Sequence, residues 1–289
     1  MQRFDGVDRF DSFAAVCAFG EWHKATSSFL YVRHGITLLQ YWILLILSHG
    51  EGGSIKELQK TLELNYTTVN ESIAALEHML LIEKSRSLDD GRVRPVCLTK
   101  QGCTVLEECD YAVWEFIAHA WTGFSEVDTK RALMVFYNAC RQQDKSRDTG
   151  TLIRGDSAFV IMCAQFMMKF QKACKDIPVT VSQAQMLMLL ERHPRGMQPK
   201  EIGKVLSRNP YAVSKAISHL VSSGLVEEAY GATKREKVVT LSEDGHSRAL
   251  RAKRAALDIM ELHFGWVEDV GFLNAVLQEL SRHLPNQKG

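Results

Sequence analysis

The sequence predicts a mainly α-helical fold with small β-hairpins, in which one domain is present twice in tandem. Three observations support this fold class. Apolar residues recur at helical spacing along most of the chain, and two short extended stretches each surround a polar turn. In addition, Thr37 aligns with Thr180 and Leu98 with Leu241, both at an offset of 143 residues, and the sequence between them aligns after one insertion and one deletion.

The composition limits the classes of protein to consider. A chain of 289 residues that is 46% hydrophobic can bury the cores of two medium domains. The longest apolar run, ITLLQYWILLIL, is shorter than a membrane span, and the N-terminus lacks a signal-peptide pattern, so we expect a cytoplasmic protein without a membrane partner. The seven cysteines show no C-x-x-C spacing, which predicts reduced thiols and neither zinc nor a disulfide frame.

The first copy begins with helices. Ser54 is a candidate N-cap, and glycines in the segment HGEGGS separate it from the apolar helix before it. A short helix, a brief turn and a second amphipathic helix make a helix-turn-helix. The expected helices are residues 10–32, 38–48, 55–62 and 66–80.

A hairpin follows at LDDGRVRPVCLTKQG, residues 88–102. The pair Asp90-Gly91 supplies the positive φ angles of a two-residue turn, and the flanks 80–86 and 93–98 are expected to form antiparallel strands. Thr99 can then cap the next helix. Three helices followed by a two-stranded wing predict a winged helix in each copy.

Helices before and after each winged helix are more apolar than a small domain needs. They are expected at residues 106–120 and 127–140 in the first copy, and at 158–174, 247–263 and 267–284 in the second. We expect them to form a helical pseudo-dimer interface between the two copies. The expected domains are residues 1–143 and 157–289, joined by the polar linker 144–156.

These motifs resemble the MarR family of bacterial transcriptional regulators. The first copy carries the family's D-x-R wing in Asp90 and Arg92 and its L-T-x-x-G helix start in Leu98, Thr99 and Gly102. The second copy matches the helices well but has no Asp before its wing arginine. The resemblance implies a regulator that binds double-stranded operator DNA through two winged helices, here supplied by one chain as in the two-domain members of the SarA type.

A recognition helix needs small polar and basic side chains opposite its apolar stripe, because these contact base edges and phosphates. The candidates in the second copy are Arg208, Asn209, Tyr211, Ser214, Lys215 and Ser218. The candidates in the first copy are Asn65, Tyr66, Thr67, Thr68 and Asn70. No acid lies between Val205 and Leu225, whereas Glu63, Glu71 and Glu77 accompany the first helix, so we expect the second helix to bind DNA better.

The wings differ in the opposite sense. Candidate DNA contacts of the first wing are Arg86, Asp90, Arg92 and Arg94. The resemblance implies that Arg92 enters the minor groove while Asp90 orients it. Candidate contacts of the second wing are Lys234, Arg235 and Lys237, which without an orienting Asp favour phosphate contact.

Several alternatives stay open at this stage. Two further functions are a plasmid-type replication initiator, which is also built from two winged helices, and a protein-binding adaptor that has lost operator binding in one half. A small aromatic ligand could bind between the lobes among Trp22, Trp42, Trp114, Trp121 and Trp266, although such residues are usually core. Cys17 is a candidate redox sensor or a buried inert thiol. No enzyme motif and no cofactor motif occurs, so we expect neither, and further oligomerisation beyond a pseudo-dimeric monomer stays open.

Overall fold

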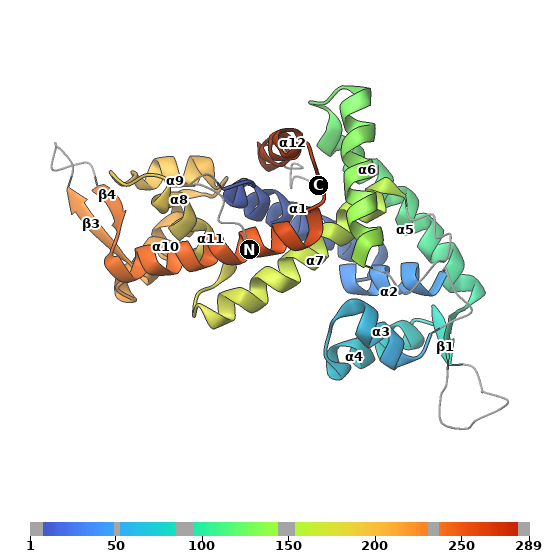
Figure 1. Ribbon diagram of the computed structural model, residues 1–289. Helices are drawn as coiled ribbons and strands as arrows, with labels where there is room; N and C mark the ends of the chain where they lie inside the picture. Colours follow the sequence, from blue (N-terminus) through green and yellow to red (C-terminus); the bar gives the residue numbers. More distant parts are fainter. Residues whose placement is uncertain (1–7, 49–52, 85–94, 144–153, 231–236, 283–289) are drawn as a thin grey trace. The chain divides into compact units, whose positions relative to one another are not determined.

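The protein is described by a computed structural model that covers residues 8–48, 53–84, 95–143, 154–230 and 237–282 (Figure 1). In these residues the chain forms twelve α-helices and two two-stranded antiparallel sheets. It divides into two compact units. The N-terminal unit comprises residues 21–164, and the C-terminal unit comprises the described residues 8–20 together with 165–282.

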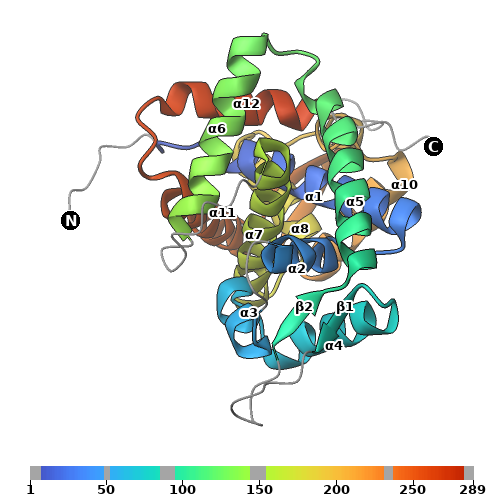
Figure 2. The same cartoon turned by 90° about the vertical axis from the view of Figure 1, so that its right-hand side faces the viewer.

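The N-terminal unit contains the first winged helix. Strands β1 and β2 pair with Ile82 opposite Leu98, and Gly53 adds a bridge to Val96. Figure 2 shows this hairpin between α4 and the start of α5. The elements are α1 (Ser12–His34) from residue 21 on, α2 (Leu38–Ser48), α3 (Ile55–Leu62), α4 (Tyr66–His78), β1 (Ile82–Lys84), β2 (Val96–Leu98), α5 (Lys100–Ala118), a short 3-10 helix (His119–Trp121), α6 (Glu126–Gln143) and the first residues of α7 (Gly155–Asp176).

The C-terminal unit repeats the same order of elements. Val226 pairs with Leu241, and Met197 forms a bridge to Val239 just as Gly53 does to Val96. The elements are α8 (Val181–Glu191), α9 (Pro199–Val205), α10 (Pro210–Ser222), β3 (Val226–Tyr230), β4 (Lys237–Leu241), α11 (Glu243–Phe264) and α12 (Val270–Arg282), together with the first residues of α1 and the later residues of α7. The predicted fold class, mainly helical with a small hairpin in each of two winged helices, is confirmed.

Local capping explains where several helices begin. The Ser54 hydroxyl accepts from the amide of Glu57, and the Glu57 carboxylate accepts from the amide of Ser54, which makes a capping box. Thr99 caps α5 as predicted. The N-caps Thr99 and Ser242 make α5 and α11 begin at the very next residue. Both helices therefore begin earlier than the apolar spacing predicts.

Several other predicted boundaries differ from those in the structure. Helix α4 ends at His78 rather than at residue 80, because Leu80 has a φ of +59° that no right-handed helix allows. Helix α7 begins at Gly155, so the last two residues of the predicted linker are helical, while residues 144–153 lie outside the described part. The compact units also cross the repeat boundary, since residues 8–20 belong with 165–282.

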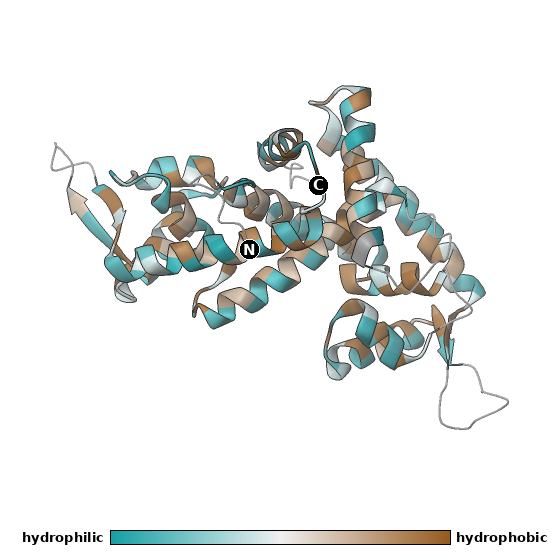
Figure 3. Cartoon of the chain, viewed as in Figure 1, coloured by the Kyte–Doolittle hydropathy of each residue, from teal (hydrophilic) through white to brown (hydrophobic). Residues whose placement is uncertain are grey.

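Each unit has an aromatic core. In the N-terminal unit the ring of Phe159 lies 6.0 Å from Trp22 and 5.7 Å from Trp121. In the C-terminal unit the ring of Phe19 lies 4.8 Å from Phe166. Helix α2 is mostly hydrophobic (Figure 3), and most of its residues are buried. No single helix of the described residues is long and apolar enough to cross a membrane. Helices α1 and α2 reach that length and apolar content only when taken together, and they are bent by 79° relative to each other.

Candidate nucleic-acid interface

The helix-turn-helix of the C-terminal unit orients α10. The turn closes at Ser207, whose φ is +51°, and the Asn209 side chain caps α10 by accepting from the amide of Ala212 at 2.8 Å. One face of α10 is buried through Val213 and Ile217, as well as through Leu220 one turn later. The opposite face of the helix is therefore directed to solvent.

That opposite face is continuous and polar. Its residues follow one another at helical spacing and line a shallow hollow of about 450 Å³: Tyr211, Ser214, Lys215, Ser218, His219 and Ser222. Tyr211 is 78% exposed. The face offers hydroxyl, imidazole and ammonium groups and no carboxylate, so it can approach a polyanion without repulsion.

Two predicted contacts of this copy have other partners. The Arg208 guanidinium donates to the Ser182 hydroxyl at 2.6 Å and to the side-chain carbonyl of Gln185. These bonds tie the helix-turn-helix to α8. The Asn209 carbonyl is likewise engaged in capping. Both side chains hold α10 in place, whereas the four other predicted residues project from the exposed face.

Helix α4 of the N-terminal unit has the same cap but a different face. The Asn65 side chain accepts from the amide of Thr68 at 2.9 Å. Tyr66 is 57% exposed, and Thr67 is also exposed. The two remaining predicted contacts, at positions 68 and 70, are half-buried. Glu71 is exposed on this helix, which has no Lys or Arg.

The predicted wing contacts fall largely outside the described residues. Arg86, Asp90, Arg92 and Arg94 lie in segment 85–94, and Lys234 and Arg235 lie in segment 231–236. Lys237 is described, and its ammonium lies 2.9 Å from the carboxylate of Glu228 across the hairpin. In the N-terminal unit Lys84 pairs similarly with Glu77 at 2.6 Å.

The base of each wing is held by the same device. In the N-terminal unit the Thr99 hydroxyl donates to the carbonyl of Leu80 at 2.7 Å and accepts from the amide of Gly102 at 2.9 Å. In the C-terminal unit Ser242 makes the corresponding bonds to Gly224 and Gly245 at 2.7 and 3.0 Å. The L-[TS]-x-x-G pattern therefore fastens the wing to the end of the recognition helix.

The basic cluster at the start of α11 also serves the unit itself. The Arg248 guanidinium donates to the carbonyl of Pro178 at 3.1 Å, and Arg251 donates to the carbonyl of Asp176 at 2.9 Å. These contacts fasten α11 to the end of α7 and to the residues that follow it. They show that part of the basic content near the second wing is structural.

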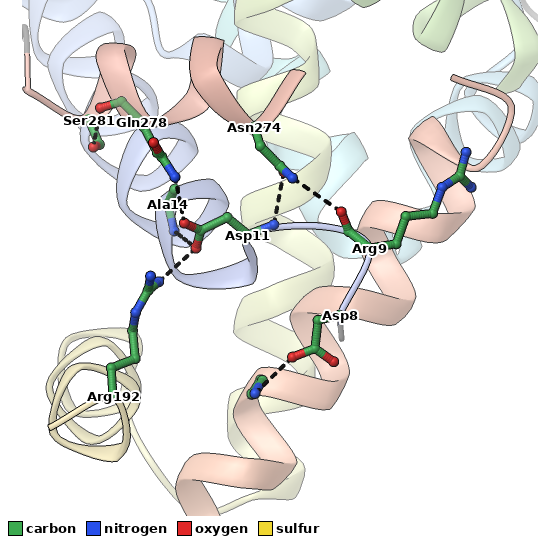
Figure 4. Close-up of polar contacts among 9 residues, drawn as sticks. Asp8, Arg9, Asp11, Ala14, Arg192, Asn274, Gln278 and Ser281 are labelled. Carbon is green, nitrogen blue, oxygen red and sulfur yellow. Dashed lines mark hydrogen bonds and ion pairs between the residues drawn. The ribbon is translucent and has the colours of Figure 1, made fainter. Parts of the chain in front are cut away.

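Sequence reasoning missed the anchor of the N-terminal segment in the C-terminal unit (Figure 4). The Asp11 carboxylate accepts from Arg192 at 2.7 Å and from Gln278 at 3.0 Å, and its backbone amide donates to Asn274 at 2.9 Å. Lys253 pairs with Asp8 at 2.8 Å. No motif indicates contacts between residues so far apart in the chain.

The predicted ligand and redox residues are mostly in cores. Trp22, Trp42 and Trp121 are 0%, 5% and 7% exposed. Cys17 is buried on α1. Trp114 is 41% exposed and Trp266 is half-buried, so the core interpretation fits three of the five tryptophans. Within the described residues no group of three metal-ligating side chains gathers.

Comparisons with known proteins match both copies. A family profile described as "Transcriptional regulator SarA/Rot" matches residues 26–109, and a profile described as "MarR family" matches residues 177–235. The chain is similar to the HTH-type transcriptional regulator TtmR of Methylorubrum extorquens (strain PA1), with 32% identity over 135 residues, or 46% of this chain and 65% of the relative. The chain thus spans less than two thirds of that relative's length.

Solved structures resemble less than half of the chain. Apo MarR from E. coli is 22% identical over 42% of this chain and 91% of its own, with a TM-score of 0.35. CouR from Rhodococcus jostii RHA1 bound to p-coumaroyl-CoA is 17% identical, and the match covers 43% of this chain and 90% of CouR, with a TM-score of 0.40. MepR in the S. aureus MepR–DNA complex is 18% identical, and the match covers 38% of this chain and 82% of that MepR chain, with a TM-score of 0.35. Two regulator profiles therefore match in tandem, one on each winged-helix region, and the chain is similar to a named transcriptional regulator.

Proposed function

We propose that the chain binds double-stranded operator DNA and regulates transcription in the cytoplasm. The observation that carries this proposal is the exposed, acid-free face of α10. A recognition helix lies in the major groove, where hydroxyl and ammonium groups meet acceptors on base edges and phosphates. The similarity to a named transcriptional regulator supports the same function.

In this proposal Lys215 lies at the centre of the contact. It is exposed on α10, one helical turn after Tyr211 and one before His219. Its ammonium donates to a base edge or a phosphate, and the neighbouring serines donate or accept as the base requires. The wing residues Arg92 and Arg235 extend the contact along the DNA.

We also propose that one chain acts as a pseudo-dimer on an operator with unequal half-sites. The repeat of one winged helix within a single chain supports this part of the proposal. The recognition helices of the two copies carry different charges, since α4 has Glu71 and no Lys or Arg, whereas α10 has Lys215 and no acid.

The test is a titration of DNA selected from random duplexes, followed by fluorescence anisotropy at several salt concentrations. Lys215→Ala is expected to weaken binding about 5- to 140-fold, which corresponds to a loss of about 1–3 kcal/mol, and Arg92→Ala is expected to do the same. Lys130→Ala on α6, where an exposed lysine is paired within its own helix to Glu126, is the control and should keep wild-type affinity. Equal affinity of Lys215→Ala, Arg92→Ala and the control would contradict the DNA-binding surface.

A protein-binding adaptor remains the second candidate, because α4 exposes Glu71 and has no Lys or Arg. The two functions differ in salt dependence. Operator binding should weaken steeply as salt rises, since each neutralised phosphate releases counterions. An adaptor that has lost operator binding in one half would bind duplexes through the other half alone, with a correspondingly smaller salt dependence.

Release from DNA by a small aromatic ligand, or by oxidation of Cys17 in place of an inert buried thiol, is an alternative that the following experiments test. Adding benzoate-type acids, or peroxide with and without a Cys17→Ala substitution, to the DNA complex tests each of them. Dissociation of the DNA complex on adding the acid supports regulation by an aromatic ligand. Dissociation by peroxide that the Cys17→Ala substitution abolishes supports regulation by the thiol.

A further inference from the structure

The two recognition helices share one register. Each has 13 residues and an asparagine N-cap whose side chain accepts from the third residue after it. Both place Val, Ile and Leu on the buried face at matching positions: Val69, Ile73 and Leu76 in α4, and Val213, Ile217 and Leu220 in α10. Each helix therefore has the same rotation about its own axis within its unit.

This register places Glu71 and Lys215 at equivalent positions. Both are the sixth residue after the N-cap asparagine, and both follow the first buried valine by two residues. Both side chains are exposed. The two copies thus present opposite charges at the same point of the same surface.

The surroundings of the two residues strengthen the difference. Lys215 has serine neighbours on its face, at positions 214 and 218, and His219 one turn later. The matching positions of α4 hold Asn70, Ala74 and Ala75. Among the described ion pairs, none involves Glu71. The charge of Glu71 is therefore the dominant polar feature of the central part of the α4 face.

Base edges distinguish these two groups. A lysine ammonium donates to O6 and N7 of guanine, whereas a glutamate carboxylate accepts from the N4 amino group of cytosine and is repelled by acceptors. We propose that Glu71 and Lys215 are the specificity-determining pair of this chain, with Lys215 selecting guanine and Glu71 selecting cytosine at the corresponding position of the other half-site. The two half-sites then differ at the base pair that these two side chains contact.

This inference rests on the proposed operator binding and adds the residue pair that makes the half-sites unequal. It also gives the acidic residue of α4 a role in DNA recognition. A carboxylate there weakens contact with phosphates but discriminates between bases, because the wrong base leaves it facing another acceptor.

The experiment is selection of binding sites from random duplexes by the full chain and three variants. The variants are Glu71→Lys, Lys215→Glu and the double exchange. Glu71→Lys should change the preferred base at one half-site from cytosine to guanine and bind the resulting site about tenfold more tightly than the wild type does. Lys215→Glu should make the reverse change in the other half-site, and the double exchange should swap the preferred bases at this position between the two half-sites.

Two further variants keep the test decisive. Glu71→Gln preserves the shape of the side chain and should lose most of the preference for cytosine without gaining guanine. Glu115→Lys changes the charge equally at an exposed position of α5 and should leave the selected site unchanged. Circular dichroism melting identifies any variant that fails to fold, in which case Glu71→Gln alone decides.

The outcomes separate this inference from the function on which it rests. If the wild type selects a salt-sensitive site and both Glu71 variants select the same site, the specificity role of Glu71 is wrong while operator binding stands. If the wild type selects no site and shows no salt-dependent binding, the proposed function itself is wrong. The inference is supported if the Glu71 variants, and not the control, change the preferred base at one position of the half-site that α4 contacts.

Discussion

Gly245 lies so close to the backbone of Leu225 that a Cβ atom there would be 1.8 Å from the Leu225 carbonyl oxygen. In the other copy a Cβ on Gly102 would be 1.9 Å from the carbonyl oxygen of Leu81. Only glycine allows the start of α5 or α11 to approach the end of the recognition helix so closely. The glycine of the L-[TS]-x-x-G pattern is therefore a packing requirement that positions the wing.

Alanine at either glycine is expected to lower the free energy of unfolding by about 3 kcal/mol, because backbone must move to remove the clash. Gly271→Ala in α12 is the matched control, since its new methyl group would make only an ordinary contact at 3.5 Å. That control should be neutral or stabilise the protein by up to about 1 kcal/mol. Urea unfolding followed by circular dichroism measures all three, and wild-type stability of Gly102→Ala would contradict the packing.

Leu80 and Gly224 occupy the same turn in the two copies and have φ values of +59° and +68°. A leucine pays a steric penalty in this conformation that glycine avoids. Leu80 is also 66% exposed, so its side chain contributes little to the core. We expect Leu80→Gly to stabilise the protein and Gly224→Ala to destabilise it, each by about 1 kcal/mol.

Thermal unfolding of these two variants gives the answer. No atom lies within 4 Å of a Cβ built on Gly224, so backbone strain is the whole expected effect there. Opposite signs for the two variants are the predicted result. A loss of stability in Leu80→Gly would mean that the leucine side chain makes a contact worth more than the strain.

The Asp11 anchor should give the protein an acid-sensitive contribution to stability. Burial alone would raise the pKa of Asp11, but hydrogen bonds from Arg192, the Ala14 amide and Gln278 lower it below its usual 3.8. A lowered pKa means that the stabilisation is complete above 3.8 and is lost as the pH falls below that value. Asp11→Asn is expected to cost about 1–2 kcal/mol at pH 7, because Arg192 is partly exposed.

The stability difference between wild type and Asp11→Asn should therefore shrink as the pH falls through 3.8. Asp258→Asn, which breaks an exposed pair with Arg254, is the control and should cost less than about 0.5 kcal/mol. Denaturant titrations at pH 3 and pH 7 measure both variants. A difference that stays constant over this range would show that the charge of Asp11 is unimportant.

Buried thiols predict a loss of stability in alkali. Burial, followed by the charges of Glu108 and Asp110, raises the pKa of Cys109 from 9.0 to about 12. The folded state then keeps a proton that the unfolded state releases, so stability is complete below pH 9 and falls as the pH rises toward 12. Cys109 should contribute about 1.4 kcal/mol per pH unit to this fall.

Cys109→Ala should flatten the pH dependence of unfolding above pH 9 by that amount. The exposed Cys103 is the matched control, and Cys103→Ala should leave the slope unchanged. Unfolding measured at half-unit steps from pH 8 to pH 11 resolves the difference. Equal slopes for both variants would show that Cys109 ionises freely in the folded protein.

Much of the fold could be predicted from the sequence because its signals are local. The helix boundaries of α2 and α3 were predicted to the residue, since glycines and a capping serine mark them. The repeat made the hairpins recognisable as wings. The end of α4 was predicted two residues too late because an apolar spacing continues through Leu80, and no sequence pattern reveals its positive φ.

The candidate site was less predictable, because the partners of a polar side chain depend on tertiary packing. Arg208 resembles a DNA contact in sequence, yet its guanidinium is bonded to α8. The Asp11 anchor joins residues more than 180 positions apart, which no periodicity can indicate. The division of α1 and α7 between the two units could not be predicted either, because a sequence repeat indicates two separate domains, one for each copy.

The most direct test of operator binding is the genome-wide occupancy of the tagged full chain in its own cell. The account predicts discrete sites near promoters that share one motif with unequal half-sites, and loss of these sites when Lys215 is replaced by alanine. Occupancy without enriched sites would contradict the account, as would a motif with identical half-sites that the substitution leaves unchanged.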